Sequence, residues 1–200
     1  MRSTLLAVAL LGMIMLVGGC KGQDKAMGLR YVPAKSTANP ADAPVYVLLT
    51  KEAHGLPSNR NNQRIIGEIV HRNGKKQADI LSAFPINEWA RNAIAGELRA
   101  AGVNASEADA FPAGAPVVES TITRMQSKTD LSFSTAQVTA TLGVEFVVTA
   151  PGGTKQTFAA QAEGTAKGSQ GPLINCRDAY ERAMQAVLRE AVPKIVRSLR

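Results

Sequence analysis

The sequence predicts an α+β domain, with a mainly antiparallel sheet of four to five strands and two helices packed on one face. Residues 132–150 alternate between apolar and polar side chains, a pattern typical of a strand with one buried face. Apolar residues recur at helical spacing in residues 86–101 and 175–198. The strand segments are grouped instead of alternating with helices. The predicted order β-β-α-β-β-β-α is therefore typical of an α+β domain.

The first predicted strand is VYVLLT, residues 45–50, which follows Pro44 and is rich in β-forming residues. Residues 64–71 predict a second strand, although a short helix also suits this segment. Asn73 and Gly74 come next and form a dipeptide typical of a tight turn.

Residues 86–101 predict a helix with one buried stripe, to which Trp89 is adjacent. Asn87 or Ser82 is the expected N-terminal cap, and Gly102 is well placed to end the helix. The stripe consists of Ile86, Ala90, Ala93, Ile94, Leu98 and Ala101.

Three long strands are predicted at residues 117–128, 132–150 and 154–167. The turn Pro151-Gly152-Gly153 separates the last two strands. The second strand has a continuous apolar face, made of Val138, Ala140, Leu142, Val144, Phe146 and Val148. Its other face, which we expect to be wet or only partly covered, carries Thr139, Thr141, Gly143, Glu145 and Thr149.

A closing helix is predicted over residues 175–198, and Pro193 is expected to bend it or end it early. Its basic residues are Arg177, Arg182, Arg189, Lys194, Arg197 and Arg200. A basic amphipathic helix can lie on an anionic membrane. We favour a solvated charged face, because the sheet needs the apolar stripe of this helix.

The first residues have the build of a secretory signal peptide, with Arg2 followed by an uncharged run from residue 4 to residue 17. The run ends in LVGGCK, which resembles a bacterial lipobox. That resemblance implies cleavage between Gly19 and Cys20, and attachment of diacylglycerol and a fatty acyl chain such as palmitate to Cys20. An ordinary signal with an incidental cysteine is the alternative. In a Gram-negative host, Lys21 implies sorting to the outer membrane.

Three regions follow from this interpretation. Residues 1–19 are a lipoprotein signal peptide, and residues 20–44 are the lipidated cysteine and a flexible, proline-containing tether. As a coil, the tether would span roughly 25–30 Å. Residues 45–200 form a single α+β domain that faces the periplasm.

The formal net charge of +7 favours anionic partners such as lipid headgroups, lipopolysaccharide phosphates or acidic glycans, or simply serves solubility, which we favour. Basic and aromatic residues are not interleaved, so we expect no nucleic acid partner.

No residue pattern indicates catalysis. His54 and His71 have only Glu68 and Asp79 as nearby carboxylates, so we predict no metal site. There is no GxSxG or SxxK motif. The glycines at 152–153 and 164–171 lack the spacing of a phosphate loop. We therefore expect no cofactor and no enzyme activity.

Cys176 would remain as an unpaired cysteine if Cys20 is lipidated. It lies at the start of a predicted helix, where the helix dipole would lower its pKa. No histidine is near it in sequence, so we favour a buried structural thiol over a reactive one.

The chain resembles the YajG-type lipoprotein family over nearly all of its mature length. The resemblance depends on the lipobox, on VYVLLT, NRNNQRIIGEIV, ELRAAGVNA and STAQVTATLGVEFVV, on the PGGTK turn, and on the AYERAMQAVLREAVPKIV helix. It implies a periplasm-facing outer-membrane lipoprotein of α+β type and carries over no catalytic residue.

Two functions are open at this point. The first is a non-catalytic envelope lipoprotein that binds a protein or lipid partner through a sheet edge or the face opposite the helices. The alternative is an auxiliary component of a lipid-transport or outer-membrane assembly system. It predicts an apolar cavity lined by Trp89, Phe146 and Phe158.

Overall fold

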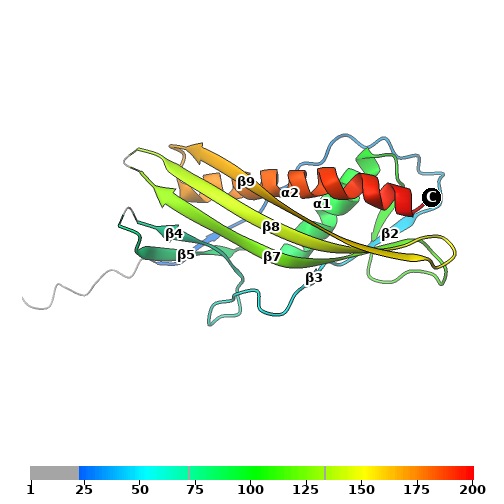
Figure 1. Cartoon of the computed structure of the whole chain (residues 1–200), viewed down its shortest axis with the longest axis horizontal. Coiled ribbons are helices and arrows are strands. Elements are labelled where there is room, and N and C mark those ends of the chain that lie inside the picture. The colour runs from blue at the N-terminus through cyan, green and yellow to red at the C-terminus, as the bar shows by residue number, and fades with distance from the viewer. Residues whose placement is uncertain (1–22, 72, 133) are drawn as a thin grey trace, which may run out of the picture.

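The computed structural model describes residues 23–71, 73–132 and 134–200, which form a mixed sheet covered by two helices (Figure 1). The predicted signal peptide and the cleavage and lipidation residues, Gly19 and Cys20, lie outside the described residues. The strands are β1 (Lys25–Met27), β2 (Val45–Leu48), β3 (Lys51–Glu52), β4 (Ile65–Val70), β5 (Lys76–Ser82), β6 (Ala105–Ala108), β7 (Val117–Leu131), β8 (Ala136–Thr149) and β9 (Lys155–Gly168). The helices are α1 (Ile86–Ala100) and α2 (Pro172–Ser198).

The prediction of a mainly antiparallel sheet of four to five strands is wrong, since the described residues form a nine-stranded mixed sheet. Strand β7 is its centre, pairing in parallel with β2, β3 and β4 and antiparallel with β8. The predicted order lacks β1, β3, β5 and β6. Strands β1, β3 and β6 are only two to four residues long, too short for a clear alternating pattern.

The three long strands are confirmed. Strand β8 pairs antiparallel with β7 on one side and with β9 on the other. The predicted apolar face of β8 is buried along its whole length. The Asn73-Gly74 turn is also confirmed, since Gly74 has a φ of 78° and joins β4 to β5.

Helix α1 agrees with its prediction and ends before Gly102, which has a φ of 86°. The predicted caps are wrong, because Pro85 occupies the N-cap position and no side chain caps the helix. Helix α2 begins at Pro172 and continues past Pro193 to Ser198. Pro193 is exposed, so water can solvate the carbonyl that its missing N–H leaves unpaired.

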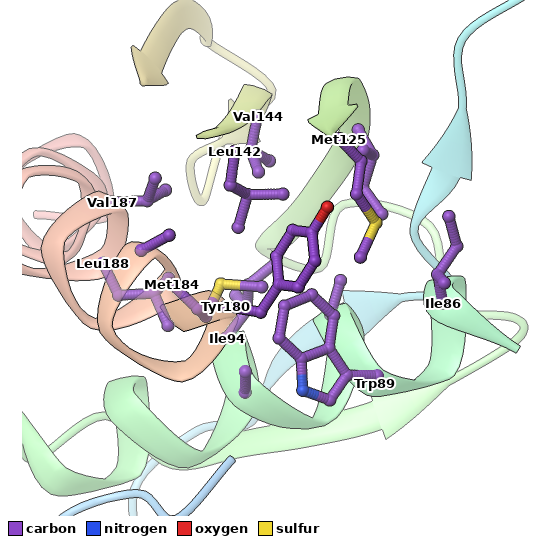
Figure 2. Packing of buried hydrophobic residues seen from close by; sticks show 14 of the residues in the cluster. Ile86, Trp89, Ile94, Met125, Leu142, Val144, Tyr180, Met184, Val187 and Leu188 are labelled. Carbon is purple, nitrogen blue, oxygen red and sulfur yellow. The ribbon is translucent and has the colours of Figure 1, made fainter. Parts of the chain in front are cut away.

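Both helices bury their apolar stripes against the same face of the sheet. Figure 2 shows Tyr180 and Met184 of α2 meeting Ile94 and Trp89 of α1, close to Leu142 of β8. Within the described residues, no helix is long and apolar enough to span a membrane.

Residues 23–44, expected to belong to a flexible tether, make extensive contacts with the domain. Strand β1 pairs in parallel with β5, and the Tyr31 hydroxyl donates a hydrogen bond of 2.8 Å to Glu97 on α1. Pro33 lies so close to α1 that a Cβ at Gly96 would approach it to 2.7 Å. The backbone N–H of Thr37 donates to the Arg99 carbonyl at 3.0 Å. This segment is therefore part of the folded body.

Candidate functional site

A buried polar cluster lies where β4 separates from β7. Strand β4 pairs with β7 only from Glu68 to Val70, so the Ile66 carbonyl lies outside that pairing. The hydroxyl of Ser127 donates to this carbonyl at 3.2 Å, and the hydroxyl of Tyr180 on α2 donates to it as well. The two hydroxyls take the place of the hydrogen bond that a neighbouring strand would have donated to this carbonyl. A buried carbonyl left without any donor would cost about 1–3 kcal/mol.

Gly67 leaves room for the Ser127 hydroxyl between the two strands. A Cβ at Gly67 would overlap the hydroxyl of Ser127. A larger residue at position 67 would therefore push β4 away from β7.

A groove of about 590 Å³ opens on the other face of the sheet, directly above this cluster. Ser127 points toward α2, where its hydroxyl lies 3.2 Å from the Cys176 sulfur. Because side chains alternate along a strand, Gln126 and Lys128 point away from α2, into the groove. Their partners on β8, Thr141 and Thr139, also line it. Pro57, Ile65 and Ile66 add apolar atoms to the lining. Met125 and Ser127, which point toward α2, also border the groove, at the place where β4 and β7 separate.

The rim of the groove carries two acids and two bases. Asp79, Glu68 and Lys128 lie side by side across β5, β4 and β7, according to the strand register. Lys76 forms an ion pair of 2.6 Å with Asp79, and this hydrogen bond is the main reason that the pKa of Lys76 is raised. The charges at this rim balance. Such a site can hold a partner by polar contacts and apolar packing without favouring either sign of charge.

Cys176 is a buried structural thiol, as we favoured, and its pKa is not lowered. Burial raises the pKa of the thiol from 9.0 to about 11, against a smaller opposing effect of the hydrogen bond with Ser127. Helix α2 begins four residues earlier than Cys176, so the thiol lies beyond the first turn, where the helix dipole acts most strongly.

We expect alkaline pH to destabilise the protein through this thiol. Below pH 9 both states keep the proton, so the contribution of the buried thiol is fully present. As the pH rises from about 9 toward 11, the unfolded state loses its proton first, and the free energy of unfolding falls by up to about 2–3 kcal/mol. Urea unfolding at a series of pH values measures this fall. In the Cys176→Ala variant the fall should be smaller, and an identical pH dependence would contradict the assignment.

The histidines considered as metal ligands, His54 and His71, are both exposed. Glu68 and Asp79 lie on neighbouring strands at the groove. In residues 23–71, 73–132 and 134–200, no group of three or more His, Cys, Asp or Glu side chains is arranged to hold a metal ion.

The three aromatic residues expected around a lipid cavity do not line one space. Phe146 is fully buried and stacks on Phe158 with ring centroids 5.5 Å apart. Trp89 lies against Tyr180 and lines a separate groove beside α1 (Figure 2). The expectation of a cavity shared by these three side chains is therefore wrong.

The apolar stripe of α2 packs against the sheet, so the basic residues of this helix face solvent or form local contacts. Arg182 donates to the Thr165 carbonyl on β9, and Lys194 pairs with Glu190 at 2.7 Å. This arrangement agrees with the solvated face that we favoured over a membrane-lying helix.

The sequence predicted part of the groove lining. The outward face of β8 was predicted, and Thr139 and Thr141 belong to it. The roles of Gln126, Lys76 and Met125 were missed. Only the pairing of β4 with β7, which lie some 60 positions apart in sequence, brings these residues together.

The fold resembles several solved structures at low sequence identity. A Xanthomonas campestris protein of the DUF330 family is 13% identical with a TM-score of 0.51, and the match covers 87% of this chain and 96% of that one. An uncharacterised protein is 10% identical with a TM-score of 0.49, covering 88% and 95%. The rare lipoprotein B from Shewanella oneidensis is 15% identical with a TM-score of 0.34, covering 66% and 91%.

The likeness to the Xanthomonas protein shows a common fold and nothing about function. No protein-family model matches this sequence, and no curated protein matches it. The resemblance to the YajG-type family stays a prediction.

Proposed function

We propose that this protein is a lipid-anchored, non-catalytic protein of the bacterial cell envelope that binds a protein partner through the groove at β4, β7 and β8. Acylated Cys20 supplies the anchor, and in a Gram-negative host the domain faces the periplasm from the outer membrane. The observation that carries the proposal is a groove with apolar lining and a charged rim, on a sheet face that neither helix covers.

The charges of the rim favour a protein over a phospholipid as partner in this groove. A phosphate would need an excess of basic groups, whereas Lys76 and Lys128 are balanced here by Asp79 and Glu68. Apolar atoms surrounded by polar groups are the usual composition of a protein interface. The volume of about 590 Å³ suits a few side chains of a partner.

The polar side chains in and beside the groove already pair with one another, which supports binding without catalysis. Asp79 is ion-paired with Lys76, and Thr141 donates a hydrogen bond of 3.3 Å to Glu163. A nucleophile would need a nearby unpaired base, and these groups already engage one another.

Site-specific photocrosslinking in intact cells tests the proposal. We expect a photoreactive residue at Gln126 to form an adduct with one envelope protein. The same residue at Thr157 should not, because Thr157 lies on the outer face at the far end of β9. The charge reversal Lys76→Glu in the Gln126 variant should weaken the adduct several-fold.

Equal adducts at Gln126 and Thr157, or no adduct at Gln126, would contradict the proposal that the groove binds a protein. Mass spectrometry of the same purified protein determines independently whether Cys20 is acylated, so failure of the anchor and failure of the groove are separate results.

A further inference from the structure

The chain is fixed to the domain only a few residues after Cys20. The carboxylate of Asp24 accepts a hydrogen bond of 3.1 Å from the Asp79 N–H. Lys25 then begins β1, opposite Ile80 of β5. Asp24 is the fourth residue after Cys20, so four Cα–Cα steps connect the two residues. Even fully extended, these four steps span at most about 14 Å.

The residues that follow cannot lengthen this connection. Strand β1, Tyr31, Pro33 and Thr37 hold residues 25–38 against β5 and α1. A coil of 24 residues would have held the domain roughly 25–30 Å from its anchor. The folded segment holds it much closer.

The direction of β1 determines which end of the domain is near the anchor. Because β1 runs parallel to β5, the chain enters from the side of the turn that joins β4 to β5. In Figure 1 this turn lies at the same end of the molecule as the start of α2. The C-terminus and the turn between β8 and β9 lie at the opposite end.

This turn is basic. Residues 71–77 read HRNGKKQ and contain no acidic residue. Lys75, Lys76 and Lys25 are exposed, and Asp79 pairs with Lys76. Asp24 accepts the backbone hydrogen bond described above, and Asp130 of β7, which lies beside the turn, pairs with Lys128 at 3.4 Å. Lysines close to a bilayer are attracted to anionic lipid headgroups.

We propose that the β4–β5 turn is the membrane-facing end of the domain, and that Lys75 and Lys76 contact the phosphates of anionic lipids. This rests on the proposed function in one respect, the acylation of Cys20. It differs from the groove, because the partner at this surface is the bilayer itself.

Fluorescence quenching on vesicles tests the orientation. The acylated full chain is incorporated into vesicles of phosphatidylcholine and phosphatidylglycerol that carry a quencher at the headgroup. A dye is attached at Gln77→Cys near the turn, or at Thr154→Cys at the opposite end. The parent chain, treated in parallel, measures any reaction of buried Cys176. We expect quenching to be several-fold greater at Gln77 than at Thr154. Asn73→Cys is a second position near the turn if the first variant is unstable.

Charge reversal tests the lipid contact. The double variant Lys75→Glu/Lys76→Glu should lower quenching at Gln77 on anionic vesicles and leave it unchanged on phosphatidylcholine alone. Lys155→Glu, at the opposite end, should have no effect. Equal quenching at Gln77 and Thr154 would overturn the orientation, and insensitivity to the double reversal would overturn the phosphate contact. A chain that does not float with the vesicles would instead contradict the anchor of the proposed function.

Discussion

Replacing Gly164 by alanine is expected to lower the free energy of unfolding by about 3 kcal/mol, at the upper end of the usual cost of overpacking. Gly164 lies on β9 at the point where α2 crosses it. An added Cβ would overlap the carbonyl oxygen of Ala179 and lie 2.5 Å from the backbone nitrogen of Ala183. Both groups belong to the helix backbone, so no side chain can rotate away. The helix as a whole must move off the sheet.

Urea unfolding of Gly164→Ala beside Gly168→Ala measures this effect. Gly168 lies on the same strand, but a Cβ there would approach the Asn175 side chain at 3.3 Å and the Gln170 backbone nitrogen only at 3.9 Å, an ordinary contact distance. We expect the Gly168 variant to lose less than about 1 kcal/mol, because a side chain can shift by a few tenths of an ångström. Equal losses would show that β9 and α2 separate more easily than their packing indicates.

Truncation of Tyr180 to alanine is expected to cost about 3–5 kcal/mol. Its side chain is fully buried, and its ring packs against Trp89 and Met184 in the centre of the core (Figure 2). Its hydroxyl bonds to the Ile66 carbonyl where β4 leaves β7. The truncation removes both the core packing and a tie from α2 to the sheet.

The Tyr180→Phe variant separates the two contributions. It keeps the ring and removes only the hydroxyl, while Ser127 continues to donate to Ile66, so we expect a loss of about 1 kcal/mol. Tyr46→Phe is the control and should be neutral, because the Tyr46 hydroxyl forms no hydrogen bond within the described part of the chain. A Tyr180→Phe loss as large as that of Tyr180→Ala would contradict the assignment to packing.

The two proposed surfaces assign different partners to different parts of the domain. The groove has balanced charges and suits a protein. At the β4–β5 turn Lys76 is paired with Asp79, but Lys75 forms no ion pair within the described residues, so this surface keeps an excess of positive charge that suits lipid phosphates. Lys76 belongs to both regions, since it lines the groove and starts β5. A protein that binds in the groove would therefore lie close to the membrane surface.

The candidate site was only partly predictable. The alternation in β8 identified an outward face with Thr139 and Thr141, because side-chain direction along a strand is a local property. The groove also needs Ile65 and Lys76, which reach it through pairing between distant segments. The prediction of a cavity lined by Trp89, Phe146 and Phe158 was wrong because contacts between distant segments decide which side chains meet. Three large apolar residues in a sequence do not indicate which of them meet.

The sequence by itself determined the α+β class, the long strands β7 to β9 and the positions of both helices, since each depends on a periodic pattern within one segment. The tertiary structure alone decided the parallel pairing of the short strands, the attachment of residues 25–38 to the domain and the passage of α2 through Pro193. Each of these depends on free energy gained from contacts between distant residues. A short strand has too weak a local preference to reveal its pairing. The cost of a proline inside a helix is about 3 kcal/mol, and the burial of Ala191 and Ile195 on either side of Pro193 helps to offset it.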